Sequence, residues 1–312
     1  MAPSSRRLSS SGEGLSPSGE RLPPSGERLS PCGADARGND HDRYLTCLFA
    51  PAGRREALFA LLAFNAEIAR VRDAVREPMM GRIRLQWWRD TLETLYRPET
   101  SLPAHPIAGP LGEAIRKHGL TQAHFETLID AREADLEEQP PSSLAGFAAY
   151  AEATSAPLLA LFLEALGAAD WSEAGRGAAF TAGRHAGIAW ALTGLLRSLP
   201  FQAARNRNSL PAELFARHSV TPCAAIGRSF DSRALAPLAA EIADLARSHL
   251  AEARRPRREA PKAALPALLQ VPLAELYLRA LARAGHDVAA PGVARQPLAP
   301  LLLCWRALRG RY

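Results

Sequence analysis

This chain of 312 residues has little of what builds β-sheets, disulfide frameworks or membrane spans. Aromatic residues make up 6% of it, and runs rich in valine, isoleucine and threonine are absent. The cysteines are far apart and have no metal-ligand or redox spacing, which argues against a disulfide framework and favours a reducing compartment; they are Cys32, Cys47, Cys223 and Cys304. No apolar run reaches the roughly 18–20 residues of a transmembrane helix, so we expect a soluble or peripheral protein.

Lysine is also scarce, since Lys117 and Lys262 are the only two among 38 basic residues. The net charge of +6 comes from arginines that mostly alternate with acids, which favours a solvated surface over nucleic-acid binding. The densest basic run, residues 254–258, is either a solvated loop or a contact for phospholipid head groups. The eight histidines show no His-x-x-x-His spacing, so none is expected to bind a metal.

The first 40 residues differ from the rest of the chain. A seven-residue unit is repeated three times, at 11–17, 18–24 and 25–31, and its Ser, Gly and Pro cannot sustain a helix or bury a core. We therefore predict a disordered low-complexity tail over residues 1–40 and a single folded domain over residues 41–312.

The predicted domain is all-α. Apolar residues recur at helical spacing between Ala57 and Val71 and between Ile83 and Leu95, and Ala and Leu are strong helix formers. Further helices are predicted from about Thr121 and over residues 142–166, with a kink at Pro157. The remaining predicted helices cover residues 172–198, 233–253, 264–284 and 297–309.

Two segments carry a family resemblance. Residues 63–73, Ala-Phe-Asn-Ala-Glu-Ile-Ala-Arg-Val-Arg-Asp, resemble the first aspartate-rich motif of squalene/phytoene synthases. Residues 187–211 are similar to the second motif, with matches at Gly187, Ala189, Arg197, Arg207, Leu210 and Pro211. The resemblance implies the helical isoprenoid-synthase fold and a prenyl transferase that joins two prenyl diphosphates.

Such a reaction requires a cluster of carboxylates. The leaving diphosphate carries several negative charges, and magnesium ions held by aspartates on facing helices stabilise it. Here the two adjacent aspartates of the first motif are replaced by Ala69 and Arg70, so that Asp73 alone remains. The second motif keeps no carboxylate; its polar positions are occupied by Ala191, Gly194, Ser198, Phe201 and Gln202, and the tyrosine before Leu-Pro by Ser209.

We therefore predict a non-catalytic protein with no catalytic residue, cofactor or metal, and magnesium is expected only under the alternative of an active prenyl transferase. The residues expected at the vestigial pocket are Asn65, Glu67, Asp73, Arg197, Arg205 and Arg207. Asp73 is either a leftover metal ligand or, as we predict, the partner of Arg70 or Arg76. The arginines either bind a phosphate, as in a lipid- or prenyl-phosphate-binding module, or pair with acids such as Glu152 and Asp135.

The small residues on the second-motif helix raise a further question. Gly187, Ala191, Gly194 and Ser198 lie on one helix face, which looks into the active cavity in the family. We predict that a neighbouring helix packs against this face, because native interiors rarely leave large voids. The adjacent Trp87 and Trp88 cannot both face one core, so they either form a partner-binding patch or include one half-buried ring.

The particular departures also resemble one branch of the family, which contains the mitochondrial complex I assembly factors. Shared features include Arg43-Tyr-Leu-x-x-Leu48, Gly81-x-x-Arg-x-Gln-Trp-Trp88, Asp130-Ala-Arg-Glu-x-x-Leu136 and Ala264-Leu-Pro-Ala-Leu-Leu-Gln270. This resemblance implies NADH dehydrogenase subunits or other assembly proteins as partners. The arginine bias is typical of a GC-rich bacterial genome, so we expect a cytoplasmic protein, peripheral at the inner membrane, or one on the matrix side in a eukaryote.

Overall fold

The computed structural model describes residues 29–75, 77–97, 101, 104–137 and 140–312, and helices are the only regular elements in them. The all-α fold predicted from the sequence is confirmed. The α-helices are α1 (Pro31–Asn39), α2 (His41–Cys47), α3 (Ala52–Ala69), α4 (Val71–Ala74), α5 (Pro78–Tyr96), α6 (Ala108–His118), α7 (Gln122–Glu133), α8 (Leu144–Ala165), α9 (Glu173–Ala204), α10 (Ala212–His218), α11 (Ala236–Arg254), α12 (Leu265–Leu268), α13 (Gln270–Arg283), α14 (Pro291–Ala294) and α15 (Ala299–Leu308). The short 3-10 helices are η1 (Ala134–Leu136), η2 (Ala168–Asp170), η3 (Pro222–Ala225), η4 (Gly227–Ser229) and η5 (Lys262–Ala264).

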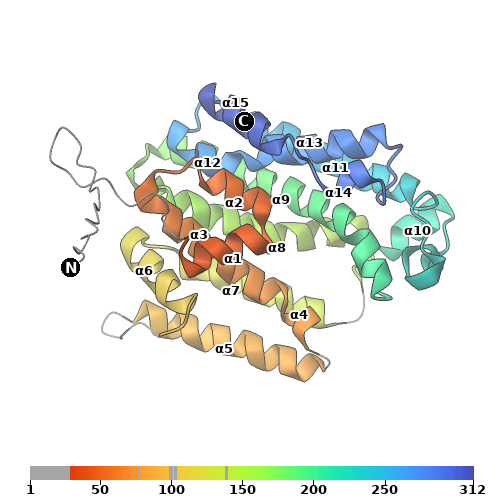
Figure 1. The fold of residues 1–312 in the computed structure, drawn as a ribbon, viewed down its shortest axis with the longest axis horizontal. Coiled ribbons are helices and arrows are strands. Elements are labelled where there is room, and N and C mark those ends of the chain that lie inside the picture. Colours follow the sequence, from red (N-terminus) through yellow and green to blue (C-terminus); the bar gives the residue numbers. More distant parts are fainter. Residues whose placement is uncertain (1–28, 76, 98–100, 102–103, 138–139) are drawn as a thin grey trace, which may run out of the picture.

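The 32-residue helix α9 organises the core (Figure 1). It begins after Ser172, whose side chain accepts a hydrogen bond from the Gly175 backbone N–H and so caps the first turn. Its small and apolar residues pack against α8 on one side and against α11 and α13 on another. Both prolines inside the long helices, Pro157 in α8 and Pro200 in α9, leave the helix continuous.

The folded domain begins earlier than the sequence predicted. Residues 31–39, assigned to the disordered tail, form α1 and pack against α3. Cys32 and Ala36 are fully buried, and the Ser30 side chain caps the helix by accepting from the Gly33 backbone N–H. Burial of these small residues explains why a segment of low-complexity composition is helical. The repeats up to residue 28 lie outside the described residues.

Helix α5 turns its two adjacent tryptophans in different directions, so that Trp88 is buried and Trp87 is exposed. Its buried residues recur every three or four positions, from Gly81 through Leu85, Trp88 and Leu92 to Leu95. Trp88 is 3% exposed, and its ring meets the Phe64 ring of α3 edge-on, with 5.1 Å between the ring centres. Phe64 in turn meets the Phe125 ring of α7 edge-on at 5.3 Å. Trp87, one position away, is 44% exposed, so the two rings have different environments.

Two helical segments have the length and composition of a membrane span, Leu144–Ala165 and Lys262–Arg283. This corrects the expectation that no apolar stretch is long enough. Half of the first apolar window and 72% of the second are buried inside the fold. Helix α8 lies against both α7 and α9, so its apolar composition is explained by burial in the core.

Candidate functional site

The acid that remains from the first motif faces the segment that follows α9. Asp73 lies in the short helix α4, which continues the chain after the turn at Arg70. One carboxylate oxygen of Asp73 accepts a hydrogen bond from Arg207 Nη1 at 2.5 Å, and the other lies 3.9 Å from Arg205 Nη1. Three of the six predicted pocket residues, from both motifs, are therefore brought together.

The salt bridge predicted between Asp73 and Arg70 is wrong, and Arg76 lies outside the described residues. The Arg70 guanidinium turns back along α3 and donates to Glu67 at 3.2 Å and to Asn39 in α1 at 2.9 Å. The reason is the turn after Ala69, which ends α3 and separates the two side chains. Arg70 is therefore not the cation that neutralises the remaining aspartate.

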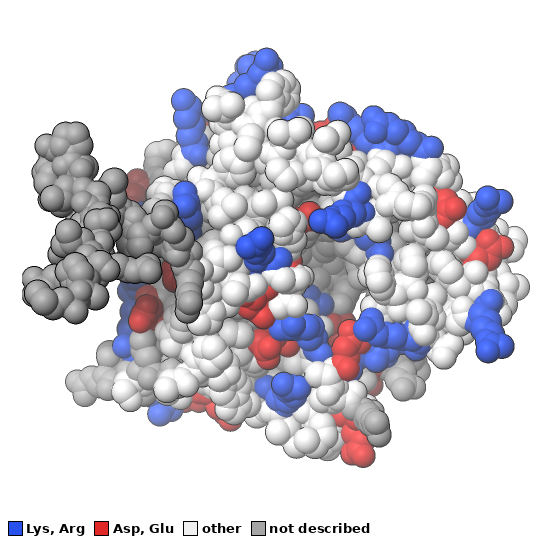
Figure 2. Space-filling model, viewed as in Figure 1, with Lys and Arg blue, Asp and Glu red and all other residues white. Residues whose placement is uncertain are grey.

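Two neighbouring cavities open at this ion pair. The larger has a volume of about 480 Å³, and Leu195 and Phe147 form part of its apolar wall. The smaller, of about 380 Å³, is lined by three arginines, two asparagines and no acid; these polar residues are Arg72, Arg205, Asn206, Arg207 and Asn208. In Figure 2 the face in view is hollowed, and basic and acidic side chains lie together at the rim.

Two carboxylates from outside both motifs line the larger cavity: Asp135, which the sequence analysis named only as a partner for the arginines, and Glu137, which it did not name. Asp135 accepts a hydrogen bond from the Tyr150 hydroxyl at 2.6 Å and lies 3.2 Å from Arg132 Nη1. Burial raises the pKa of Tyr150, which keeps its hydroxyl a hydrogen-bond donor. Glu137 lies 2.7 Å from Arg82 Nη2. The signal available in the sequence was the segment Asp130–Leu136, which contains Asp135 and resembles the assembly-factor branch.

These residues do not fit the magnesium cluster of an ionising synthase. Magnesium needs carboxylate oxygens that are free to turn toward the metal, whereas Asp73, Asp135 and Glu137 each already contact an arginine. Across the described ranges, no group of three or more His, Cys, Asp or Glu side chains is placed to hold a metal ion. The surplus of guanidinium groups instead suits an anion that binds without a metal.

Asn65 and Glu67 do not line either cavity. Asn65 is 5% exposed on α3, and its Oδ1 is buried without a hydrogen-bond partner among the described residues. Glu67 pairs with Arg70, the residue directly after the end of α3. Both residues lie on α3 away from the two cavities, so the prediction that they line the pocket was wrong.

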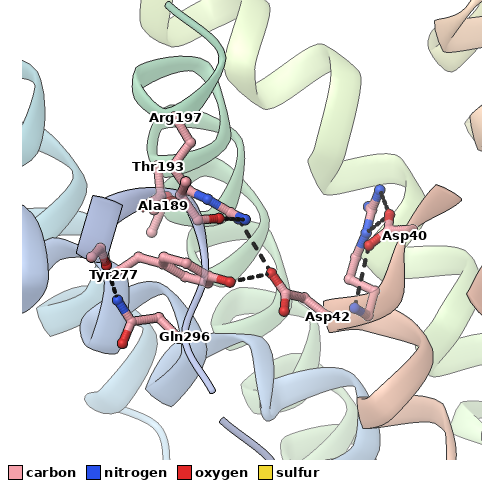
Figure 3. Close-up of polar contacts among 10 residues, drawn as sticks. Asp40, Asp42, Ala189, Thr193, Arg197, Tyr277 and Gln296 are labelled. Atoms are coloured by element: carbon pink, nitrogen blue, oxygen red, sulfur yellow. Dashed lines mark hydrogen bonds and ion pairs between the residues drawn. The ribbon is translucent and has the colours of Figure 1, made fainter. Parts of the chain in front are cut away.

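Arg197 also lies apart from the cavities, in a second polar cluster (Figure 3). Its Nη1 is 3.2 Å from Asp42 in α2, and its guanidinium carbon lies 3.7 Å from the centre of the Tyr277 ring in α13. Tyr277 donates a hydrogen bond to Asp42 at 2.7 Å. The cluster ties α2, α9 and α13 together, and Asp42 is a residue that the sequence analysis did not single out.

Arg197, Arg205 and Arg207 do contact acids, which was one of the two alternatives, but not the two acids named for it. Glu152 accepts a 2.9 Å hydrogen bond from Arg184, and Asp135 contacts Arg132. Partner choice is decided by which helices lie side by side, and sequence spacing does not contain that information across different helices.

The small-residue face of α9 is closed at one end and open at the other. A Cβ added at Gly187 would lie 3.1 Å from the backbone nitrogen of Ala156, so α8 packs directly against that glycine. At Gly194 nothing lies within 4 Å, and the next residue, Leu195, lines the larger cavity. The prediction that a neighbouring helix covers this face therefore holds at Gly187 and fails at Gly194.

Comparisons with known proteins identify the family and the fold. The sequence profile of the family described as squalene/phytoene synthase matches residues 36–302. A cattle (Bos taurus) protein named NADH dehydrogenase (ubiquinone) complex I, assembly factor 6 is 34% identical over 277 residues, which cover 88% of this chain and 80% of the relative.

A presqualene diphosphate synthase of Rhodopseudomonas palustris is 28% identical over 223 residues, covering 69% of this chain and 75% of that protein. Among solved structures, a dehydrosqualene synthase in complex with ligand superposes with a TM-score of 0.74 at 15% identity, over 89% of this chain and 94% of the other. At that level of identity, the structural likeness shows the fold alone.

Proposed function

Because the chain belongs to the squalene/phytoene synthase family, we propose that it is a non-catalytic member that acts in the assembly of NADH dehydrogenase, respiratory complex I. The similarity to the assembly factor over most of both chains supports this proposal. Its proposed partners are NADH dehydrogenase subunits or other assembly proteins. The proposed site of action is the cytoplasmic side of the bacterial inner membrane, or the matrix side in a eukaryote.

The observation that carries the non-catalytic part is the ion pair at Asp73. An ionising synthase presents several carboxylates to its magnesium ions, and here the remaining motif aspartate contacts two guanidiniums, Arg207 at 2.5 Å and Arg205 at 3.9 Å. Recruiting Asp73 to a metal would leave both arginines beside the cation, which is electrostatically unfavourable. The pocket therefore favours a structural or anion-binding role.

The assembly role is tested by deleting the gene in its own host. NADH:quinone oxidoreductase activity and assembled complex I in isolated membranes are expected to fall, while succinate oxidation serves as the control respiratory activity. Wild-type protein and the isosteric variant Asp73→Asn are both expected to restore the complex, because no catalytic step depends on that carboxylate. Unchanged complex I levels in the deletion strain would contradict the assembly role.

The alternative, prenyl transfer, is tested separately with purified protein. Farnesyl or geranylgeranyl diphosphate is supplied with magnesium, and release of diphosphate is measured against an active presqualene diphosphate synthase as the positive control. No release above the protein-free background is expected. Turnover that Asp73→Asn abolishes would establish an enzyme and overturn the non-catalytic proposal.

A second candidate function, compatible with the first, is binding of a lipid or prenyl phosphate. Its support is the pair of cavities, in which arginines offer bidentate contacts to phosphate beside an apolar wall with Phe147 and Leu195. Native mass spectrometry of the purified protein is expected to show a bound anionic lipid that Arg72→Gln weakens. The control is Arg247→Gln, which changes an exposed arginine paired with Asp244 outside the cavities; equal retention by both variants would contradict the candidate.

A further inference from the structure

The outer side of α15 carries a row of exposed apolar side chains. Leu298 is 64% exposed, Leu301 68%, Trp305 46% and Leu308 88%. They lie at spacings of three, four and three, which places them along one side of the helix. Three of the four highest exposed fractions among the large apolar side chains of the described residues are in this row.

The opposite side of the same helix holds it to the core. Ala299 and Leu303 are 1% and 0% exposed, and α15 packs against α13. Both sides of α15 are therefore apolar, although the fold needs only one for packing. The helix lies at the edge of the molecule beside the C-terminus (Figure 1), so the row faces outward along its whole length.

The segment that carries the row has basic residues and no acidic ones. Residues 288–312 contain no Asp or Glu and four arginines: Arg295, Arg306, Arg309 and Arg311. The Arg309 and Arg306 guanidinium carbons lie 4.3 and 5.2 Å from the centre of the Trp305 ring, so an aromatic face and two cations are presented together.

The basic loop at residues 254–258 belongs to the same surface. Arg254 and Arg306 both contact Glu275, at 2.6 and 3.9 Å. Burial raises the pKa of Tyr312 to about 12, and the positive charge of Arg257 opposes that shift. In Figure 2, basic side chains project at the top of the molecule, where α15 lies.

We propose that α15 and the arginine loop 254–258 form a docking surface for an anionic lipid bilayer. An outward apolar row that includes a Trp, on a segment that has arginines and no Asp or Glu of its own, is the pattern of a helix that lies in the interface plane of a membrane. The leucines enter the acyl boundary, Trp305 lies at head-group depth, and the guanidiniums contact lipid phosphates.

Charge complementarity separates this surface from the exposed apolar row of α5. That row consists of Met79, Met80, Ile83 and Trp87, but its helix also carries acids, including Asp90 and Glu93. Such mixed charge gives no preference for an anionic surface. Trp87, at 44% exposed, is therefore a control site in an exposed apolar row outside the proposed surface.

The proposal is tested by co-sedimentation of the full chain with phosphatidylcholine vesicles, with and without phosphatidylglycerol. Wild-type protein is expected to bind the vesicles that contain phosphatidylglycerol more tightly than the vesicles that lack it. Leu301→Ser/Leu308→Ser is expected to weaken binding by at least about tenfold, because two leucines no longer leave water. Arg309→Gln/Arg311→Gln is expected to weaken it by about tenfold and to reduce its salt dependence.

Trp87→Ser should bind as wild type does, and circular dichroism verifies that every variant is folded. Three results would overturn the proposal: no binding of the wild type to either vesicle, unchanged binding of the leucine variant, or an equal loss with Trp87→Ser. Sedimentation equilibrium tests whether a second copy of the chain occupies the row instead. A wild-type dimer that Leu301→Ser/Leu308→Ser dissociates, together with no vesicle binding, would assign the row to that dimer contact. The proposal does not depend on the assembly role.

Discussion

Asp73 and Arg207 are 134 positions apart in the sequence, and their side chains form an ion pair at 2.5 Å. The pair joins α4 to the segment after α9, which are the two places where the family motifs lie. In a synthase these elements approach one another through carboxylates and metal ions. Here an arginine bridges the same gap directly, so the fold is held across the pocket without a metal.

A double-mutant cycle measures how strong this bridge is. The side chains of Asp73 and Arg207 are 38% and 29% exposed, so solvent screens the pair, and a coupling below about 1 kcal/mol is expected between Asp73→Asn and Arg207→Gln in urea unfolding. The Tm in magnesium chloride is expected to equal the Tm in sodium chloride of the same ionic strength. A rise in Tm specific to magnesium, lost in Asp73→Asn, would show that the carboxylate binds the metal.

Two of the glycines in α9, Gly187 and Gly194, should respond oppositely to alanine. Gly187→Ala is expected to destabilise the fold by about 1–3 kcal/mol, because its methyl group would meet the α8 backbone at Ala156, which cannot move without separating the helices. Gly194→Ala is expected to be neutral or to stabilise by up to about 1 kcal/mol through helix propensity. Urea unfolding of both variants gives the comparison, and similar losses at the two sites would show that the open space at Gly194 is absent.

Substitutions of the two adjacent tryptophans of α5 should also differ in their effect on stability. Trp88→Ala is expected to cost about 3–5 kcal/mol of unfolding free energy, since its 3% exposed ring packs against Phe64. Trp87→Ala is expected to stay within about 1 kcal/mol of wild type, because its ring is 44% exposed. The measurement is chemical denaturation followed by circular dichroism. A larger loss at Trp87 than at Trp88 would contradict the orientation of α5.

Stability should fall on acidification through a histidine pair between α9 and α11. The Nδ1 atoms of His185 and His249 lie 2.9 Å apart, and such a hydrogen bond requires at least one neutral ring. Burial lowers the pKa of both below 6.5, and Arg184 lowers both further. The carboxylates of Glu152 and Glu252 oppose these shifts.

The direction of this change in stability with pH follows from proton binding. Below about pH 6.5 the unfolded chain binds more protons at these residues than the folded chain, so the free energy of unfolding decreases as the pH falls. Wild-type protein is therefore expected to be less stable at about pH 5.5 than at about pH 7.5, and His249→Gln is expected to flatten that slope. A residual slope is expected from His118, whose pKa burial also lowers. An unchanged slope in His249→Gln would remove the pair as its source.

The sequence by itself determined the helical fold and the loss of the metal-binding carboxylates. Helix hydrogen bonds connect residues four apart, so periodic apolar positions such as those of α3 and α5 define helices locally. The replacements at Ala69, Arg70 and Gly194 are likewise visible residue by residue. The helical segment 31–39 was missed because its Gly- and Pro-containing composition carries no apolar stripe, and burial of Cys32 against α3 decides its structure.

Only the tertiary structure decided which charges meet. Asp73 pairs with Arg207 and Asp42 with Arg197, across 134 and 155 positions, and neither partner follows from spacing on one helix. The same holds for Gly187 and Gly194, which share a face of α9 although α8 covers only the first. Contacts between helices depend on how the apolar faces pack in three dimensions. Sequence patterns therefore predict each helix, but not which other helices lie against it.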